Sequence, residues 1–209
     1  METPMTPGLR LIPAQEYRRE RWRNGLGWTR EIVREAIDPG ADDWVWRLSI
    51  ADIESDADFS AFPGVDRELV LLHGQGLRLR FDDGETIALE PPYGKHRFAG
   101  ERALRGELVD GPTRDFNLMW RRDRIEADLW RRPLVGSMIL FAEPGAVWAV
   151  YLLSGRAQAV CADTRIGFDP GDTAILCADA TRQRCQLDGG GEALLIRLHP
   201  ISNRITESA

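Results

Sequence analysis

The pattern that most constrains this chain is a two-residue alternation of side chains, repeated in many short stretches. In residues 44–53, WVWRLSIADI, large apolar side chains occupy every second position and face one way: Trp44, Trp46, Leu48 and Ile50. Residues 77–81, LRLRF, alternate strictly and are followed by a hairpin turn sequence, DDG, at residues 82–84. No long segment carries the apolar stripe of a helix. The alternation therefore predicts an all-β chain of short strands, as in sandwiches and barrels.

A weak internal repeat indicates that one β unit occurs twice. Residues 68–80 and residues 149–161 align, because each has an apolar stretch, the sequence LL-x-G and a second stretch. The order of strand, glycine-ended hairpin, strand, Pro-x-Gly turn and strand is the outline of a cupin. We therefore expect a bicupin, with two small jelly-roll-like β-barrel lobes in one chain. Residues 1–120 would form the first lobe, and residues 121–209 a charge-rich connector followed by the second lobe.

Composition narrows the classes of function. The net charge is −6, which offers no electrostatic footprint for nucleic acid. No stretch reaches the roughly 18 apolar residues of a membrane span, and the first ten residues lack the apolar centre of a signal peptide. The three cysteines have no metal-binding or disulfide spacing, so buried, reduced thiols are expected: Cys161, Cys177 and Cys185. These features favour a cytoplasmic protein that binds neither nucleic acid nor membrane.

The metal chemistry typical of cupins is not expected. That chemistry needs two close histidines, a glutamate and a later histidine, whereas the three histidines here are scattered: His73, His96 and His199. In residues 59–70, where the first ligands would fall, the side chains include two phenylalanines and the cationic Arg67. The glycine pairs in this chain also lack the third glycine of a dinucleotide-binding loop. No metal or other cofactor is therefore predicted.

Polar residues on strand faces are the remaining candidates for a site. Alternation places Arg47 with Ser49, and pairs Thr29 with Glu31 and Asp115 with Asn117 in their own segments. Buried charges must be paired or hydrogen-bonded, which leaves two interpretations open. In the first, Arg47 and Arg67 are neutralised by Glu31 and Asp115 in a closed network. In the second, the network is open and the arginines bind a small carboxylate.

Residues 21–32, RWRNGLGWTREI, resemble the opening signature W-x-N-G-x-G-x-T-R-E-I of the HutD/Ves family. Further matches follow in the family's order in residues 46–77, 96–101 and 110–122, and Leu26 stands where many relatives have glycine. The resemblance implies a cytoplasmic two-barrel cupin without the cupin metal ligands. It also implies a link to histidine utilisation for HutD, and to stress-induced expression for the Ves branch.

The resemblance further implies a binder or regulator, with a small acidic metabolite of histidine breakdown as ligand, such as N-formyl-L-glutamate. Carried over by motif, the ligand-binding positions are Asn24, Thr29, Glu31, Arg47, Ser49, Arg67 and Asn117. The arginines would pair with carboxylates, while the hydroxyl and amide groups would donate hydrogen bonds. The residues expected at the rim, or behind these contacts, are Trp22, Trp28 and Asp115.

Two other functions remain open from the residues alone. One is a metal-independent cupin enzyme, an isomerase or hydrolase, with Glu31 as a general base whose pKa is raised by burial. The other is an interaction module, in which the tryptophans of residues 22–28 and 44–46 form a protein-facing patch. Self-association as a homodimer is also left open.

Overall fold

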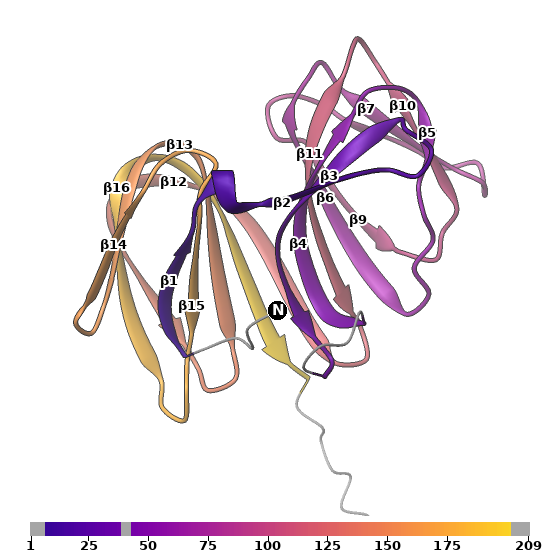
Figure 1. The fold of residues 1–209 in the computed structure, drawn as a ribbon. Helices are drawn as coiled ribbons and strands as arrows, with labels where there is room; N and C mark the ends of the chain where they lie inside the picture. Colours follow the sequence, from indigo (N-terminus) through magenta and orange to yellow (C-terminus); the bar gives the residue numbers. More distant parts are fainter. Residues whose placement is uncertain (1–6, 39–42, 202–209) are drawn as a thin grey trace, which may run out of the picture.

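The computed structural model describes residues 7–38 and 43–201, and nearly all regular structure in these residues is β-strand. Figure 1 shows two lobes side by side, each a strongly curved set of strands. The only helical element in the described residues is the short 3-10 turn η1, Ala14–Glu16. The all-β prediction is confirmed, and so is the burial of the three cysteines.

The first lobe is built from two antiparallel sheets. As far as the chain is described, the larger sheet has the order β2-β3-β4-β11-β6-β9: β2 Arg18–Arg21, β3 Gly27–Ala36, β4 Trp44–Ile53, β11 Thr113–Arg121, β6 Val65–His73 and β9 Lys95–Ala99. The smaller sheet has the order β5-β10-β7-β8: β5 Ala57–Asp58, β10 Leu104–Leu108, β7 Leu77–Phe81 and β8 Thr86–Leu89. Apolar side chains between the sheets, among them Leu69, Leu79 and Phe98, form the core of this lobe.

The second lobe is one sheet that folds over on itself. Its described strands have the order β1-β15-β13-β16-β12, with β14 added to β13: β1 Gly8–Ile12, β15 Thr173–Cys177, β13 Val147–Cys161, β16 Gln183–Pro200, β12 Ile125–Ala142 and β14 Thr164–Phe168. Strand β1 comes from the start of the described chain, yet it pairs with β15. Gly8–Ile12 therefore lies in the sheet of the second lobe, whereas a division at residue 120 assigns it to the first.

A line of glycines lets this sheet bend. Gly155 and Gly191 are register partners on β13 and β16, and both have positive φ. A Cβ on Gly155 would lie 1.8 Å from the carbonyl oxygen of Gly190, so no other residue fits. Consequently β12, β13 and β16 continue through the bend as long strands. Residues 149–161, expected as two separate stretches, form part of the single strand β13, and the charge-rich segment that begins at residue 121 runs into β12.

Register explains why polar side chains gather inside the first lobe. Because side chains alternate along a strand, every second residue of β4, β11 and β6 faces the smaller sheet. The register sets these residues side by side in transverse rows: Arg47, Met119 and Arg67; Ser49, Asn117 and Leu69; Ala51, Asp115 and Leu71. Strand β3 extends the last row, since Thr29 pairs with Ala51. Side chains that are separate in sequence thus meet on one face.

The opposite face of the same sheet packs against the second lobe. Trp46, Leu48 and Phe116 are almost fully buried there, in one cluster with Tyr151 and Leu194 of the second lobe. The rings of Phe116 and Tyr151 lie 5.3 Å apart, centroid to centroid. The apolar side of residues 44–53 is therefore not the interior of the first barrel, but the contact between the two lobes.

Polar contacts also join the lobes. The Lys95 ammonium donates hydrogen bonds to Glu68 Oε1 at 2.6 Å and to the carbonyl oxygen of Leu129, on β12, at 2.9 Å. On the other side, the Tyr17 hydroxyl lies 2.6 Å from the carbonyl oxygen of Gly171, to which it donates. Since Leu129 and Gly171 belong to the second lobe, these contacts fix its orientation at two separate places.

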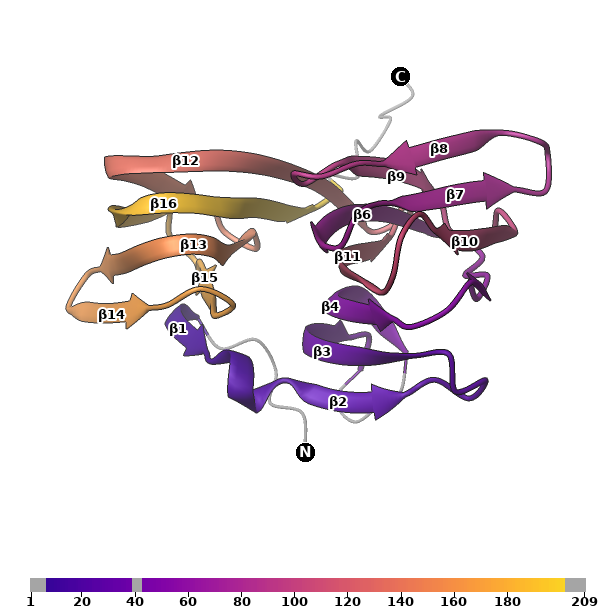
Figure 2. The same ribbon diagram turned by 90° about the horizontal axis from the view of Figure 1, so that it is seen from above.

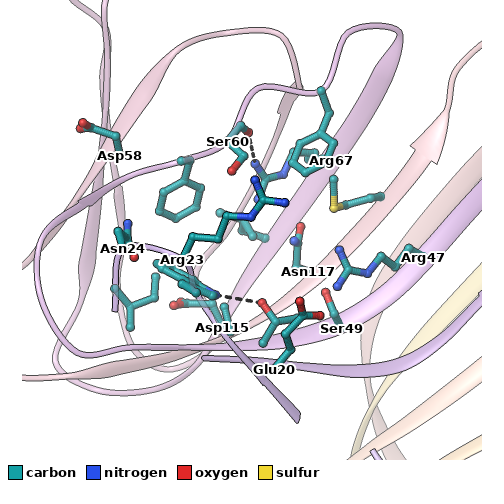
Figure 3. Close-up of a pocket in the computed structure, with 18 of the residues that line it drawn as sticks. Glu20, Arg23, Asn24, Arg47, Ser49, Asp58, Ser60, Arg67, Asp115 and Asn117 are labelled. Atoms are coloured by element: carbon teal, nitrogen blue, oxygen red, sulfur yellow. Dashed lines mark hydrogen bonds between the residues drawn. The ribbon is translucent and has the colours of Figure 1, made fainter. Parts of the chain in front are cut away.

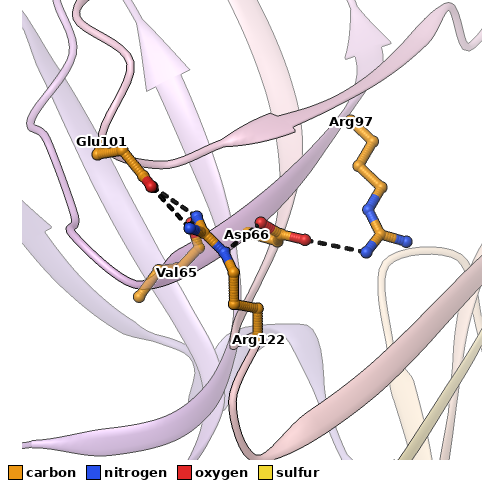
Figure 4. A network of polar contacts seen from close by, with 5 residues as sticks. All are labelled: Val65, Asp66, Arg97, Glu101 and Arg122. Carbon is orange, nitrogen blue, oxygen red and sulfur yellow. Dashed lines mark hydrogen bonds and ion pairs between the residues drawn. The ribbon is translucent and has the colours of Figure 1, made fainter.

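An arginine network holds the end of β11 in place (Figure 4). Arg122 donates from Nε to Asp66 at 2.8 Å, from Nη2 to the carbonyl oxygen of Val65 at 2.8 Å, and from Nη1 to Glu101 at 2.6 Å. Arg97 reaches the other oxygen of Asp66 at 3.0 Å. The hydrogen bonds from Arg122 lower the pKa of Glu101 to about 2. Part of the charge density around residues 121–136 therefore serves to anchor the chain where it leaves the first lobe.

Candidate functional site

A cavity of about 400 Å³ opens inside the first lobe, between the larger sheet and the loops at its end. Figure 3 shows polar side chains from several strands pointing into it. Eight of the residues predicted for the site line this cavity: Trp22, Asn24, Thr29, Arg47, Ser49, Arg67, Asp115 and Asn117. Its apolar wall includes Phe59, Phe62 and Met119. A cavity of this size, with a few convergent polar groups, suits a metabolite-sized ligand.

Arg67 is the most unusual group in this cavity. Its side chain is buried among the rings of Phe59, Phe62 and Phe98, each 5.3–5.6 Å from the guanidinium carbon. Among the described residues its only hydrogen bond goes to the carbonyl oxygen of Ser60, at 3.4 Å, and its Nε has no partner. Burial, and next to it the charge of Arg47, lowers the pKa of Arg67 to about 10, which still leaves it charged at neutral pH. The fold therefore buries a cation without a carboxylate.

Arg47, in contrast, has an acidic neighbour. Its Nε lies 2.8 Å from Glu31 Oε2, an ion pair in which the N–H is not aligned for a hydrogen bond. Glu31 also lies 3.4 Å from Arg18 and 3.9 Å from Arg34. Glu31 does not line the cavity, although it was expected to contact a ligand. It lies behind Arg47 instead. Of the two interpretations of the arginines, the closed network applies to Arg47, which has a carboxylate neighbour. The open network applies to Arg67.

Asp115 and Asn117 supply buried oxygen atoms beside the arginines. Asp115 is fully buried, and its Oδ2 accepts a hydrogen bond from the Thr113 hydroxyl at 2.8 Å. Burial raises the pKa of Asp115 to about 7. Asp115 Oδ1 and Asn117 Oδ1 are buried without a partner among the described residues. Unsatisfied buried oxygens are costly, so both are suited to accept hydrogen bonds from a ligand.

The loop between β2 and β3 closes one side of the cavity. Gly25 has a φ of +73°, and a Cβ on Gly27 would lie 2.5 Å from the carbonyl oxygen of Asp52, so both glycines are required by the turn. Asn24 Oδ1 accepts a hydrogen bond from the Leu26 amide at 3.0 Å, and Trp22 Nε1 donates to the Thr29 hydroxyl at 2.9 Å. Asn24 and Thr29 thus already have partners that hold the loop.

Trp28 lies outside the cavity. It follows Gly27 on β3 and precedes Thr29, and neighbouring residues of a strand face opposite ways. Since Thr29 faces the cavity, Trp28 faces away and packs under Arg19, whose guanidinium carbon is 4.0 Å from the ring. Trp28 therefore does not lie at the rim of the cavity, which was one of the two positions expected for it. The tryptophans also form no common surface patch, because Trp46 is buried between the lobes and Trp22 lines the cavity.

Several residues of the cavity had not been predicted. Glu20 reaches it because β2 pairs with β3 and sets Glu20 opposite Thr29. Arg23 and Ser60 come from loops, and Figure 3 shows the Arg23 side chain extending across the opening. Glu20 lies two residues before Trp22, which was expected near the site, so alternation could have suggested it, whereas loop residues carry no periodic signal.

The donor set of the cavity does not fit a divalent metal. Its lining contains no histidine or cysteine, and it includes four arginines: Arg21, Arg23, Arg47 and Arg67. Within residues 7–38 and 43–201, no three His, Cys, Asp or Glu side chains are placed to hold a metal ion. The same residues include no helix of the length and apolarity that crossing a membrane requires.

Sequence comparisons identify a family and several relatives that this chain resembles. The HutD family model matches residues 14–195. An uncharacterized 21.2 kDa protein of the hutC 3′ region of Pseudomonas putida is 42% identical over 121 residues, which cover 58% of this chain and 63% of that protein. Protein Ves of Citrobacter koseri is 37% identical over 141 residues, covering 66% of this chain and 69% of that protein.

Solved structures share the whole fold. HutD from Pseudomonas fluorescens SBW25, solved in a formate condition, has a TM-score of 0.77 at 30% identity, with 92% of this chain and 98% of that chain covered. A conserved protein of unknown function from Pseudomonas aeruginosa PAO1 gives 0.80 at 29% identity, with the same coverage. A cupin 2 conserved barrel domain protein from Leptotrichia buccalis, 9% identical, gives 0.58 over 94% of this chain and 99% of that chain. The fold is therefore that of the cupins.

Proposed function

This chain belongs to the HutD family, and on that premise we propose that it binds a small carboxylic acid of histidine breakdown in the cavity of the first lobe. N-formyl-L-glutamate is the ligand that we favour. In this proposal the protein is a binder whose loaded state regulates histidine utilisation, and not an enzyme of the pathway.

The observation that carries the proposal is the unpaired charge of Arg67. A guanidinium that is 5% exposed and has no carboxylate partner among the described residues leaves the cost of its burial uncompensated. A ligand carboxylate would supply the missing partner through charge-assisted hydrogen bonds, with the fork geometry that arginine favours. Arg47 lies in the same row of the sheet and would give a second carboxylate a cationic neighbour.

The neutral groups of the cavity favour an amide-bearing acid. Asn117 Oδ1 and Asp115 Oδ1 need donors, and the N–H of a formylated amino group is such a donor. The Ser49 hydroxyl, on the same row as Asn117, can donate to a carbonyl or carboxylate oxygen. The connection to histidine utilisation rests on the family and on the relative named for the hutC region.

The direct test is ligand-induced stabilisation. We expect N-formyl-L-glutamate at millimolar concentration to raise the Tm of the wild-type protein, and formate, the carboxylate named for the P. fluorescens HutD structure, to do so more weakly. The variant Arg67→Met should lose both responses. The matched control is Arg78→Met, an exposed arginine on β7 outside the cavity, which should respond like the wild type. Failure of formate, glutamate, urocanate and N-formyl-L-glutamate alike would end the proposal.

A metal-independent enzyme is the second candidate, and Asp115 is the observation that favours it. A carboxyl group whose pKa is about 7 can take up and release a proton at neutral pH, and it lines the same cavity as Arg67. Glu31, which the sequence suggested for this role, is held by Arg47 outside the cavity. The general base of an enzymatic mechanism would therefore be Asp115.

Turnover separates the two candidates. If the protein is an enzyme, incubation with the same acids gives product that proton NMR detects, and Asp115→Asn abolishes product formation while ligand-induced stabilisation remains. If the protein is a binder, the acids stabilise it and are recovered unchanged.

A further inference from the structure

Exposed apolar side chains are concentrated on one short stretch of β12. Four large apolar residues of the described chain are exposed, and three of them fall within seven residues: Val135 at 89%, Ile139 at 37% and Phe141 at 44%. The fourth, Val109, lies elsewhere, in the first lobe. An apolar cluster of this kind usually marks an interaction surface.

This stretch lies on the free edge of a sheet. In the described residues β12 pairs with β16 on one side only, and Figure 2 shows it along the outside of the second lobe. The first half of the edge is partly covered, since Lys95 donates to the carbonyl oxygen of Leu129 and Arg131 to that of Pro92. Beyond Pro133 no described strand pairs with this edge. The Phe141 carbonyl oxygen accepts a hydrogen bond from Trp148 Nε1 at 2.9 Å, and the part of the edge before Phe141 remains open to another strand.

The open half of the edge has little of the usual protection, and the charged side chain near it is Arg182, whose guanidinium carbon lies 4.0 Å from the centre of the Phe141 ring. Charged side chains, prolines and short strand length are the features by which proteins prevent a free edge from pairing with another strand. Residues 134–142, LVGSMILFA, contain no charged residue and no proline, in a chain of which 29% is charged. An uncharged, apolar and long edge of this kind is suited to pairing with another strand.

We propose that this edge pairs with the same edge of a second copy of the chain, antiparallel about a two-fold axis near Met138. Such an isologous contact would continue the sheet of one second lobe into that of the other. It would set Val135 of one copy beside Phe141 of the other, and Ser137 beside Ile139.

Charge favours a second copy as the occupant. Each chain carries a net charge of −6, so two copies approach each other most easily at an uncharged stretch. The stretch is bordered by Arg131 and Arg132 at one end and by Glu143 at the other. Arg131 also pairs with Glu192 at 3.3 Å and Glu143 with Arg182 at 2.9 Å, in ion pairs at the surface of the same chain. Antiparallel pairing brings the basic end of each strand to the acidic end of its partner, whereas parallel pairing would join like charges. The strand is thus complementary to itself only in the two-fold arrangement.

Light scattering coupled to size exclusion tests the pairing. We expect the wild-type protein to shift from monomer to dimer between about 1 and 100 µM. Val135→Lys should raise the dimer Kd by about tenfold or more, because a lysine on the outer face protects an edge. Ile139→Lys should act in the same way, and it serves as a second variant if one of the two folds poorly. The matched control is Val109→Lys, which changes the exposed valine of the first lobe and should leave the Kd unchanged.

Disulfide trapping tests the register. The double variant Val135→Cys with Phe141→Cys should form a covalent dimer when oxidised glutathione is added, and neither single variant should do so. The native cysteines are buried and give a low background. A wild-type protein that stays monomeric over the whole range would overturn the proposal. So would a dimer that survives both lysine variants, one that Val109→Lys also disrupts, or one that the double cysteine variant does not trap.

Discussion

Arg67 and Asp115 show how one barrel interior can hold opposite charges without letting them neutralise each other. Arg67 lies among aromatic rings with no carboxylate partner in the described chain, and the Asp115 carboxyl is held by a neutral hydroxyl, that of Thr113. Each group is therefore less stable in its charged form than it would be in water. Such a site is poised for a ligand, and the protein gives up stability to maintain it.

The first expected consequence is that removing the unpaired charge stabilises the empty protein. Arg67→Met keeps much of the side-chain volume and should raise the free energy of unfolding by about 1–3 kcal/mol, because no buried charge remains to be compensated. Urea unfolding without ligand measures the change. A variant less stable than the wild type would mean that the aromatic contacts of Arg67 stabilise the fold by more than its unpaired charge destabilises it.

The second expected consequence concerns the dependence of stability on pH. The folded-state pKa of Asp115, about 7, lies above the ordinary value of 3.8, so the folded protein keeps this proton where the unfolded chain releases it. The contribution of Asp115 to stability is therefore fully present below about pH 4 and is lost as the pH rises towards 7. Relative to the wild type, Asp115→Asn should gain a few kcal/mol between pH 4.5 and pH 8, since its amide never ionises.

Urea midpoints at several pH values measure this difference. The matched control is Asp123→Asn, which replaces an exposed aspartate in the turn after β11 and should keep the wild-type pH dependence. An Asp115→Asn variant whose curve runs parallel to that of the wild type would show that Asp115 is ionised throughout this pH range.

Whether the sequence could identify a cavity residue depended on what fixes the position of that residue. Alternation was sufficient for Arg47 and Ser49, because a strand face is fixed by counting in twos. Alternation would also have placed Trp28 away from the cavity, because Trp28 adjoins Thr29 on the same strand. That Glu31 pairs with Arg47 and leaves Arg67 without a partner depends on strand register and side-chain reach, which no local pattern contains.

At the scale of single elements, the bend of the second lobe gives the sharpest test. Gly155→Ala should lower the free energy of unfolding by about 2–4 kcal/mol, since its φ is +85° and its Cβ would strike the carbonyl oxygen of Gly190. The matched control is Gly190→Ala on the neighbouring strand, where a Cβ meets nothing within 4 Å. Chemical denaturation compares the two, and equal losses would show that the bend does not depend on close backbone approach.

These glycines also explain where the element prediction failed. Glycine after an apolar run usually ends a strand, so residues 149–161 were expected to contain a turn. In the structure Gly155 allows β13 to bend while its pairing with β16 continues on both sides of a bulge at Leu152 and Ser154. A glycine that ends a strand and one that bends it look alike in sequence, because the difference lies in the neighbouring strand.

At the scale of the whole molecule, the shared core predicts cooperative unfolding of the two lobes. Phe116, on β11, is fully buried against Tyr151 of the second lobe. Phe116→Ala should destabilise the protein by about 3–5 kcal/mol. It should also shift the unfolding curves from circular dichroism and tryptophan fluorescence together. Two separate transitions in calorimetry would contradict this and would show that the lobes fold independently.

The sequence repeat suggested two lobes, but it could not assign the first strand to one of them. Strand β1 pairs with β15, which lies more than 160 residues further along the chain. Its sequence, GLRLI, suits either lobe. Only the spatial order of the strands decides, and a repeat within one chain carries no information about which strand fills an edge.

Strands β4 and β11 present cavity residues and lobe-contact residues at alternate positions. Because the two sets never share a position, the side chains that line the cavity can change by substitution while the contact between the lobes stays intact. Deleting or inserting one residue in either strand would have a different effect. It would turn the charged face of the strand towards the second lobe and the tryptophan face into the cavity. The cavity and the contact between the lobes would then be disrupted together. These two strands should therefore tolerate substitutions but not insertions or deletions.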